Sequence, residues 1–266
     1  MQVYRGLPIL TNQPSTPTRL VGIWNLDHQA SVVEYARLAH RAIDDAVVRG
    51  ATPVVTGGTG LYFRAALADL DVPPAPKPRA RERWTRVYDR LGPEGAHAEL
   101  AARDPAAAAR LHPNDRRRVV RALELAEAGA SLRPERDRLW SVDTRQPTLV
   151  VGLEVPEDEL RRRIDARAEE MIRRGAGAEA RAALSGPISS TARNVIGLHE
   201  AAELPETEAA TAIALRTRRY AAYQRKWMRR IPGLVTVRAD RAAPETAREI
   251  LRLAGRGEPL PAGRSG

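Results

Sequence analysis

The sequence contains no cysteine, so a disulfide scaffold, a catalytic thiol and a zinc ribbon are all excluded. It has no apolar run long enough to span a bilayer, and its N-terminus lacks the apolar stretch of a signal peptide. We therefore expect a cytoplasmic protein with no membrane partner. The expected oligomeric state is a monomer.

Lysine is nearly absent, because only Lys77 and Lys226 occur, yet lysine and arginine together number 43 against 33 acidic residues. The net charge of +10 is therefore carried almost entirely by arginine. A guanidinium binds phosphate in a two-pronged fork and stacks on bases, so this composition favours a nucleic-acid or polyphosphate partner. An arginine-rich surface that reflects codon bias is the alternative.

Several enzyme signatures are missing as well. No G-x-x-x-x-G-K-[ST] pattern occurs, which excludes a self-contained P-loop NTPase. Asp27-His28 has no nearby serine in a nucleophile-elbow context, which argues against a hydrolase. The scattered histidines are not spaced as metal ligands, so no metal held by the protein alone is expected.

The most informative stretch is Thr52–Leu67, in which a β-branched run, Pro53–Thr56, ends in a GGTG turn at residues 57–60. A helical pattern begins directly afterwards, at Leu61. Glycines let a ligand approach the backbone, and the free N–H groups of a helix start favour anions. Thr59 adds a hydroxyl to this turn. A tight connection without a ligand is the alternative interpretation.

Strands and helices alternate along much of the chain, which predicts an α/β fold with a parallel sheet core and an α-helical insertion. Ser31 and Glu34 form a capping box for a helix that ends near Gly50. The predicted strands are Leu20–Leu26, Pro53–Thr56, Thr148–Val155 and Leu234–Asp240. The predicted helices include Arg79–Leu91, Ala96–Arg103, Pro105–Leu111, Pro156–Gly175, Glu179–Leu184, Glu206–Arg230 and Pro244–Ala254, with a loop at Ala192–Leu204.

The domain boundaries follow from composition. The proline-rich joint Leu70–Pro78 separates the core from a charged helical segment. We expect a discontinuous core of residues 1–74 and 147–254, a helical insertion at 75–146, and a disordered tail at 255–266.

The helix that Asn114 or Asp115 is expected to cap carries Arg117 and Arg121 four residues apart on one face, with Arg118 beside them. A row of guanidiniums could clamp phosphates. A solvated face paired with Glu124 and Glu127 is an equal alternative.

The long helix Glu206–Arg230 carries two stripes at helical spacing. One is basic (Arg218, Arg225, Arg229) and the other aromatic (Tyr220, Tyr223, Trp227). Such faces can hold an RNA backbone while stacking a base. A simple core stripe is the preferred interpretation of the aromatic residues.

With these pieces in place, the chain resembles the bacterial tRNA dimethylallyltransferases, also called tRNA isopentenyltransferases. The matching motifs are MQVYRGL (1–7), GGTGLYFRAAL (57–67), DPAAAARLHPNDRRRVVRALEL (104–125), IGLHE (196–200) and TRRYAAYQRKWMRR (217–230). Five motifs in order, spread along almost the whole chain, make the resemblance specific.

The resemblance implies a nucleotide-binding core related to P-loop kinases and a helical insertion that grips the tRNA anticodon stem-loop. It also implies transfer of a dimethylallyl group from dimethylallyl diphosphate to N6 of a flipped adenosine 37, with Mg²⁺ on the diphosphate. The residues that it assigns to tRNA binding are Met1, Gln2, Thr59, Arg81, Arg117, Arg118, Arg121, Asn194, Gly197 and His199. It places Gly57, Gly58 and Arg218 on the diphosphate, and Thr59 and Arg218 in the catalytic centre.

The chain also departs from the family pattern. Family members carry a GPTASGK-type phosphate loop and a strand ending in D-S just before MQVYRG, whereas here Met1 holds the methionine of that motif. In the family, the loop would cradle the diphosphate and the aspartate would act as general base. Smaller departures are Tyr223, where arginine is usual, and Lys226, where threonine is usual.

These departures predict an N-terminally shortened form of a full enzyme, with little or no turnover. Its strand Pro53–Thr56 would lack a hydrogen-bonded neighbour, and buried unpaired backbone groups cost about 1–3 kcal/mol each. The alternatives are a catalytically silent RNA-binding remnant and a transferase acting on free adenine nucleotides. The arginine-rich insertion argues against the last of these, because a free nucleotide has no stem-loop for such an insertion to bind.

Overall fold

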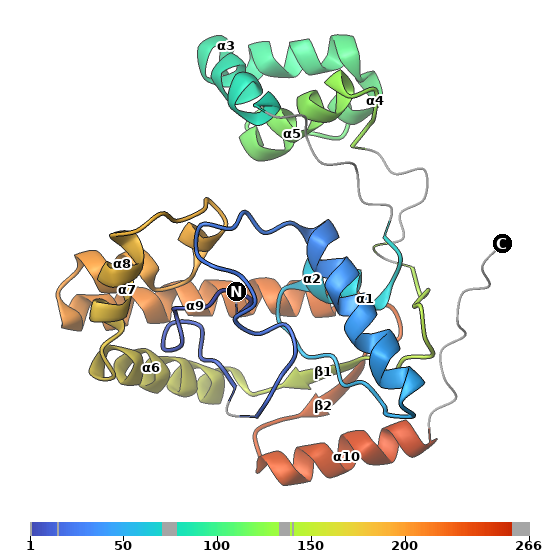
Figure 1. Ribbon diagram of the computed structural model, residues 1–266, viewed down its shortest axis with the longest axis vertical. Coiled ribbons are helices and arrows are strands. Elements are labelled where there is room, and N and C mark those ends of the chain that lie inside the picture. Colours follow the sequence, from blue (N-terminus) through green and yellow to red (C-terminus); the bar gives the residue numbers. More distant parts are fainter. Residues whose placement is uncertain (1, 15, 71–78, 133–138, 140, 257–266) are drawn as a thin grey trace. The chain divides into compact units, whose positions relative to one another are not determined.

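The chain forms two compact units in the computed structural model, which describes residues 2–14, 16–70, 79–132, 139 and 141–256 (Figure 1). The first unit comprises residues 1–69 and 139–266, and the second comprises residues 70–138. No helix among the described residues is both long enough and apolar enough to cross a membrane.

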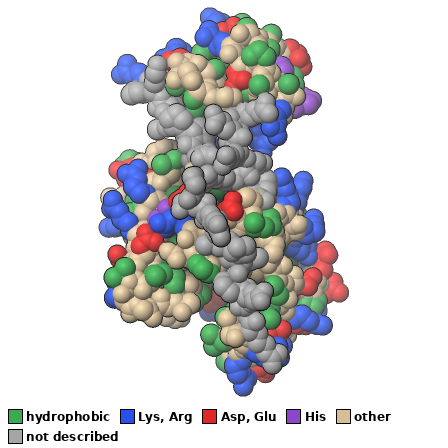
Figure 2. Space-filling view, turned by 90° about the vertical axis from the view of Figure 1, so that its right-hand side faces the viewer, with side chains coloured by type: hydrophobic (Ala, Val, Ile, Leu, Met, Phe, Trp, Pro, Cys, Tyr) green, Lys and Arg blue, Asp and Glu red, His purple; other side chains and the backbone are tan. Residues whose placement is uncertain are grey.

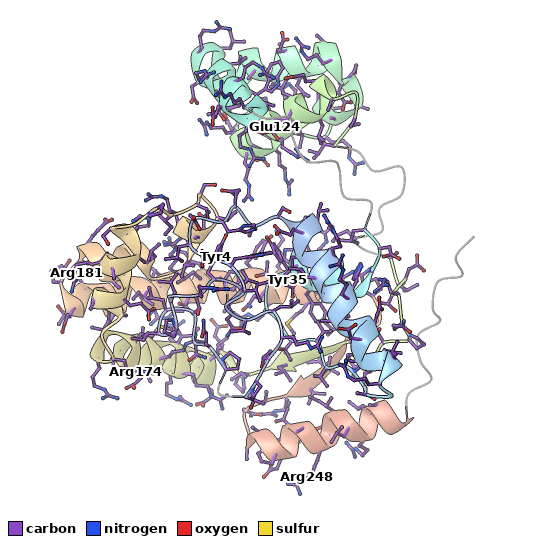
Figure 3. All side chains as sticks on the ribbon, in the orientation of Figure 1. Tyr4, Tyr35, Glu124, Arg174, Arg181 and Arg248 are labelled. Atoms are coloured by element: carbon purple, nitrogen blue, oxygen red, sulfur yellow. The ribbon has the colours of Figure 1, made fainter. Side chains whose placement is uncertain are left out.

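The N-terminal segment of the first unit is irregular but firmly anchored. Tyr4 is fully buried and forms an isolated parallel bridge with Trp24. Its hydroxyl donates to the His28 carbonyl oxygen at 3.0 Å and also hydrogen-bonds Thr191. Tyr4, labelled in Figure 3, thereby ties the first residues of the chain to a segment far along the sequence.

Helices make up most of the first unit. They are α1 (Val32–Val48), α2 (Gly60–Leu67), α6 (Glu157–Arg173), α7 (Ala176–Leu184), the 3₁₀ helix η2 (Ala192–Asn194), α8 (Leu198–Glu203), α9 (Glu206–Met228) and α10 (Ala243–Arg256). As predicted, Ser31 caps α1, accepting the Glu34 N–H at 3.2 Å. The main core packs Met171, Leu198 and Ile213 together, from α6, α8 and α9.

The sheet of the first unit has two parallel strands among the described residues, β1 (Val151–Glu154) and β2 (Val235–Arg238). Val151 lies opposite Val235 in this pair. α10 packs beside β2, and α9 runs across the unit from α8 to α2 (Figure 1). The predicted α/β class is therefore present in a coarse form, as a helix-rich unit with a small parallel sheet.

Two predicted strands are wrong. Leu20–Leu26 contributes only the Trp24 bridge, and Pro53–Thr56 has no strand conformation. Between described residues, positions 52–58 make no backbone–backbone hydrogen bond, and Val54 is exposed. A ladder needs a neighbouring strand about 4.8 Å away, so β-branched composition alone does not make one. The predicted loop Ala192–Leu204 is also wrong in part, because η2 and α8 lie within it.

The second unit is helical. It contains α3 (Ala80–Arg103), α4 (Pro105–Ala108) and α5 (Arg116–Glu127). Gly92 interrupts α3 with a left-handed φ of 72°, which accounts for the two shorter helices predicted there. Asp115 caps α5 by accepting the Arg118 N–H at 3.2 Å. α3 and α5 pack around a core of their own that includes Trp84, Leu100 and Leu123.

The segment that returns to β1 lies with the first unit, although residues 139–146 were predicted to belong to the insertion. Its anchor is Arg64 of α2, which is fully buried. Arg64 donates to the carbonyl oxygens of Leu139, Ser141 and Asp143 at 3.0, 2.9 and 3.4 Å. Burial lowers the pKa of this guanidinium, and the charge of Asp143 partly offsets that effect.

Of the predicted disordered tail, Gly255 and Arg256 are the last residues of α10. The other ten tail residues, 257–266, lie outside the described residues. So does most of the predicted joint, at 71–78.

Replacing Arg64 by methionine tests its anchoring role. Arg64→Met keeps an unbranched side chain but removes every donor, and we expect the free energy of unfolding to fall by about 1–3 kcal/mol for each carbonyl left buried without a donor. Urea denaturation measures this. Arg41→Met, which removes an exposed arginine of α1, is the control and should change stability by less than about 0.5 kcal/mol. Equal stability of the two variants would contradict the anchoring role.

Candidate functional site

The glycine turn of residues 57–60 docks on α9. The Thr59 hydroxyl hydrogen-bonds the Tyr220 hydroxyl at 2.8 Å. One helical turn further along α9, the Gln224 amide donates to the Gly58 carbonyl oxygen at 3.1 Å. Almost another turn along, the Trp227 ring lies so close to Gly60 that a Cβ there would come within 2.1 Å of it. Three side chains on one face of α9 thus fasten the turn.

The outer side of the turn is open. Gly57 is exposed, and a Cβ added to it would meet nothing within 4 Å. α2 begins at Gly60, and the preceding Thr59 makes no side-chain cap to the N–H groups of its first turn. Uncapped N–H groups beside an open glycine can bind an anion. Anion binding by this turn stays a prediction.

Arg218 lies elsewhere on α9. Its guanidinium forms a short ion pair with Asp165 of α6, and its Nε is buried without a hydrogen-bond partner among the described residues. Side chains two residues apart on a helix point about 200° apart, so Arg218 and Tyr220 face different neighbours. The structure therefore brings Thr59 to Tyr220 but pairs the other predicted catalytic residue with Asp165.

The aromatic stripe of α9 is not a simple core stripe, so the preferred interpretation was wrong for part of it. Tyr220 and Trp227 hold the turn, whereas Tyr223 is 51% exposed and makes a T-shaped contact with the Trp227 ring, with the ring centroids 6.2 Å apart. Arg225 and Arg229 make no ion pair with another described residue. An exposed aromatic ring and these two guanidiniums therefore lie together at the C-terminal end of α9, where Arg229 is the cap residue.

In the segment with Asn194, Gly197 and His199, Asn194 is exposed, His199 is half-buried and Gly197 is buried. The Asn194 amide donates to the Ser190 carbonyl oxygen at 2.7 Å, and His199 Nδ1 lies 2.9 Å from Glu203 Oε1. Gly197 has a φ of +92°, and a Cβ there would come within 2.9 Å of Leu10. Gly197 is therefore required by the backbone and its packing, whatever else it does.

Glu200 lies beside this segment and pairs with Arg216 of α9 at 2.8 Å. Burial alone raises the pKa of the Glu200 carboxyl. Hydrogen bonds from Arg216 and from backbone N–H groups outweigh burial, so the pKa lies below its ordinary value.

Of the two site residues predicted at the N-terminus, the structure describes only Gln2. Met1 lies outside the described residues. Gln2 is exposed, and its amide donates to the Asn12 carbonyl oxygen at 2.7 Å.

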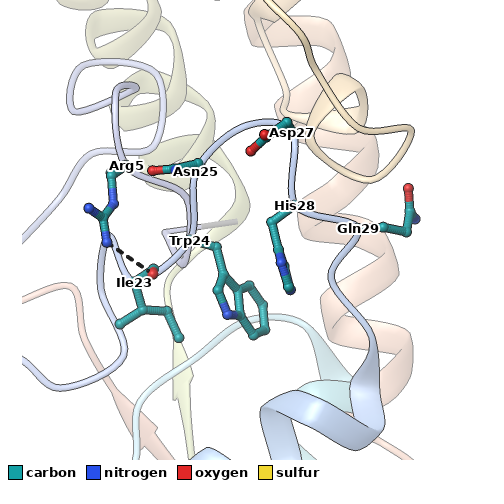
Figure 4. A pocket seen from close by; sticks show the side chains of 7 residues that line it. All are labelled: Arg5, Ile23, Trp24, Asn25, Asp27, His28 and Gln29. Carbon is teal, nitrogen blue, oxygen red and sulfur yellow. Dashed lines mark hydrogen bonds between the residues drawn. The ribbon is translucent and has the colours of Figure 1, made fainter.

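A polar pocket of about 510 Å³ lies in the N-terminal part of the first unit, where no site was predicted. Its lining residues are Arg5, Ile23, Trp24, Asn25, Asp27, His28 and Gln29 (Figure 4). The His28 ring stacks on Trp24 at 4.8 Å, and Arg5 donates to the Ile23 carbonyl oxygen at 3.1 Å. The available signal was the succession of aromatic and polar residues at 24–29, but no spacing rule distinguishes it from an ordinary loop.

The arginines predicted in the second unit fall into two groups. The Arg117 side chain is exposed and makes no hydrogen bond or ion pair with another described residue, and the Arg118 side chain lies 3.5 Å from that of Asp115. Arg81 and Arg121 instead both bind Glu124, at 2.8 and 3.0 Å. The alternative of a face paired with Glu124 thus holds for Arg121, but Glu124 is buried rather than solvated. Figure 3 labels it on α5.

Charges of both signs are distributed over the surface. On the face in Figure 2, arginine and lysine side chains mingle with acidic ones instead of forming one continuous patch. The described residues contain no group of three or more histidine, cysteine or acidic residues that could hold a metal ion.

Comparison with known proteins gives a consistent result. A family model described as IPP transferase matches residues 2–231. The tRNA dimethylallyltransferase of Kineococcus radiotolerans is 38% identical over 268 residues, which cover 95% of this chain and 84% of the relative. The enzyme of the same name from Rhodopseudomonas palustris is 38% identical over 265 residues, covering 94% and 84%.

Solved structures have the same fold. The full-length tRNA isopentenylpyrophosphate transferase of Bacillus halodurans matches with a TM-score of 0.65 at 27% identity, over 96% of this chain and 84% of that one. A eukaryotic dimethylallyltransferase acting on tRNA matches with a TM-score of 0.72 over 100% of this chain and 74% of that one. At 23% identity, this second likeness concerns the fold alone.

A glycine-to-alanine series tests how the turn docks on α9. Gly60→Ala would drive a methyl into the Trp227 ring, and we expect it to lower the free energy of unfolding by about 1–3 kcal/mol. Gly58→Ala should cost less, because the Gln224 side chain that it meets at 1.8 Å can swing away. Gly57→Ala meets nothing and serves as the control. Thermal unfolding measures all three, and equal losses at positions 57 and 60 would refute the docking.

Proposed function

The chain belongs to the IPP transferase family, and from that membership we propose that it transfers a dimethylallyl group from dimethylallyl diphosphate to N6 of adenosine 37 in tRNA. The relatives that support this proposal cover nearly the whole chain and are named tRNA dimethylallyltransferases. In the reaction, the N6 nitrogen attacks the first carbon of the dimethylallyl group. The bond from that carbon to the diphosphate oxygen breaks, and N6 releases a proton to water.

The observation that carries the proposal is the open glycine turn held by α9. The diphosphate would bind at Gly57, Gly58 and the uncapped start of α2. Free backbone N–H groups at a helix start donate hydrogen bonds to an anion, and the helix dipole favours its negative charge. Thr59 would lie beside the reacting groups with its hydroxyl oriented by Tyr220. Arg218 would join the diphosphate only by exchanging Asp165 for it.

Magnesium enters this proposal with the substrate. Mg²⁺ keeps several of its waters and is commonly bound through substrate phosphates, so an ion carried by the diphosphate needs no protein cage.

The second unit supplies the proposed tRNA contacts. Two packed helices, α3 and α5, carry the exposed Arg117, the Asp115-paired Arg118 and the group Arg81–Glu124–Arg121. Arginine binds RNA phosphates well because its guanidinium is charged and forked. We propose the anticodon stem-loop as the RNA element bound, by a monomer in the cytoplasm. A core related to P-loop kinases belongs to the same proposal.

The test is a transfer assay with enzyme in excess. Dimethylallyl diphosphate and tRNA are incubated with the chain, the tRNA is digested, and N6-modified adenosine is quantified by mass spectrometry. We expect slow modification of tRNA with adenosine 37 and none of a control tRNA with guanosine at that position. Binding to both tRNAs should weaken as salt rises, because phosphate contacts release counterions.

Each outcome separates the candidate functions. Modified adenosine supports the transferase. Salt-dependent tRNA binding without any product indicates the catalytically silent RNA-binding protein instead. Neither binding nor product, or transfer to free adenine nucleotides alone, would reject the proposal. The low turnover expected from the sequence stays a prediction until this rate is measured.

A further inference from the structure

A buried carboxylate lies beneath two surface arginines in the second unit. The Glu124 side chain is 0% exposed, between the buried Leu123 and Leu125 of α5. Its Oε1 accepts from Arg81 Nε at 2.8 Å and its Oε2 from Arg81 Nη2 at 3.3 Å. Oε2 also accepts from Arg121 Nη1 at 3.0 Å. A carboxylate is costly to bury unless it is paired, and here both oxygens are paired.

The three side chains differ in how far they are exposed to solvent. Arg81 is 58% exposed and Arg121 is 21% exposed, whereas Glu124 has no exposure. The carboxylate therefore lies below its partners, and the guanidiniums lie between it and solvent. Arg81 comes from α3 and Arg121 from α5, so Glu124 fixes the spacing of two cations that belong to different helices.

Glu124 binds one edge of the Arg81 guanidinium. Nε and Nη2 bind Glu124, which fixes the plane of the guanidinium. A guanidinium has five N–H donors, so Arg81 keeps donors for a second acceptor. An arginine side chain has about 2 kcal/mol of rotamer entropy, and one already fixed loses less of it on binding. Arg117, one turn before Arg121, extends the basic row.

We propose that Glu124 is a positioning residue for RNA binding: it fixes Arg81 and Arg121 in the arrangement that meets phosphate oxygens of the tRNA backbone. The inference rests on the proposed function, because tRNA is the partner. Glu124 itself touches no RNA and acts only through the two arginines.

The direction in which tRNA affinity changes when Glu124 loses its charge distinguishes a positioning role from a purely electrostatic one. If Glu124 merely neutralised its neighbours, removing its negative charge would strengthen binding to a polyanion. If Glu124 positions them, removing the charge releases the guanidiniums and weakens binding. The two roles predict opposite changes in affinity.

The experiment compares Glu124→Gln with Glu127→Gln in the full chain, using tRNA affinity across a salt series. Glu127 lies on the same helix and binds Arg83 and Trp84 of α3, so both variants remove a carboxylate that links α3 to α5. Both also raise the net charge by one. We expect Glu124→Gln to weaken tRNA binding about tenfold. Its salt slope should become shallower by about 0.7–0.9 for each phosphate that the variant no longer binds. We expect less than a twofold change for Glu127→Gln.

A second variant covers the case in which Glu124→Gln lowers the helix content seen by circular dichroism. Arg81→Lys keeps the charge and a partner for the carboxylate, but an ammonium cannot form the fork, and positioning predicts weaker tRNA binding for it. Unchanged or tighter binding by a folded Glu124→Gln, or wild-type affinity of Arg81→Lys, would overturn the inference alone. Absence of tRNA binding by the unsubstituted chain would overturn it together with the proposed function.

Discussion

The docking of the glycine turn on α9 is the contact on which the first unit depends. Thr59 and Tyr220 are 161 residues apart in the chain, yet their hydroxyls meet at 2.8 Å. α2 starts at this turn and carries Arg64, which holds the segment leading to β1. α9 leads in turn to β2, the partner of β1. Glycine at position 60 makes this possible, because any side chain there would meet Trp227.

The second unit depends on its own core and on a buried, paired carboxylate. Its core of α3 and α5 is self-contained, and the charge within it, Glu124, is paired by arginines that reach the surface. Rigid helices are a good support for cations that must meet a fixed array of phosphates, because their spacing is set before binding. The proposed function therefore divides between a turn suited to an anion and a helical unit suited to RNA.

Features set by neighbouring residues could be predicted from the sequence. Ser31 and Asp115 start helices where expected, because a cap needs only residues within one turn. Pro53–Thr56 has strand composition, but strand formation depends on a partner that its own residues do not specify. The pairs Arg218–Asp165 and Arg81–Glu124 join residues 53 and 43 positions apart, so no local pattern reveals them. The family motifs predict site residues but not these contacts.

The most direct test of the central claim is a double-mutant cycle between Thr59→Val and Tyr220→Phe, read as free energies of unfolding. Each substitution removes one hydroxyl and keeps the size of the side chain. A hydrogen bond between the turn and α9 should give a coupling energy of about 0.5–1.5 kcal/mol, its net value in a folded protein. Losses that add within about 0.3 kcal/mol would show that the two hydroxyls do not interact and that this bond does not hold the turn on α9.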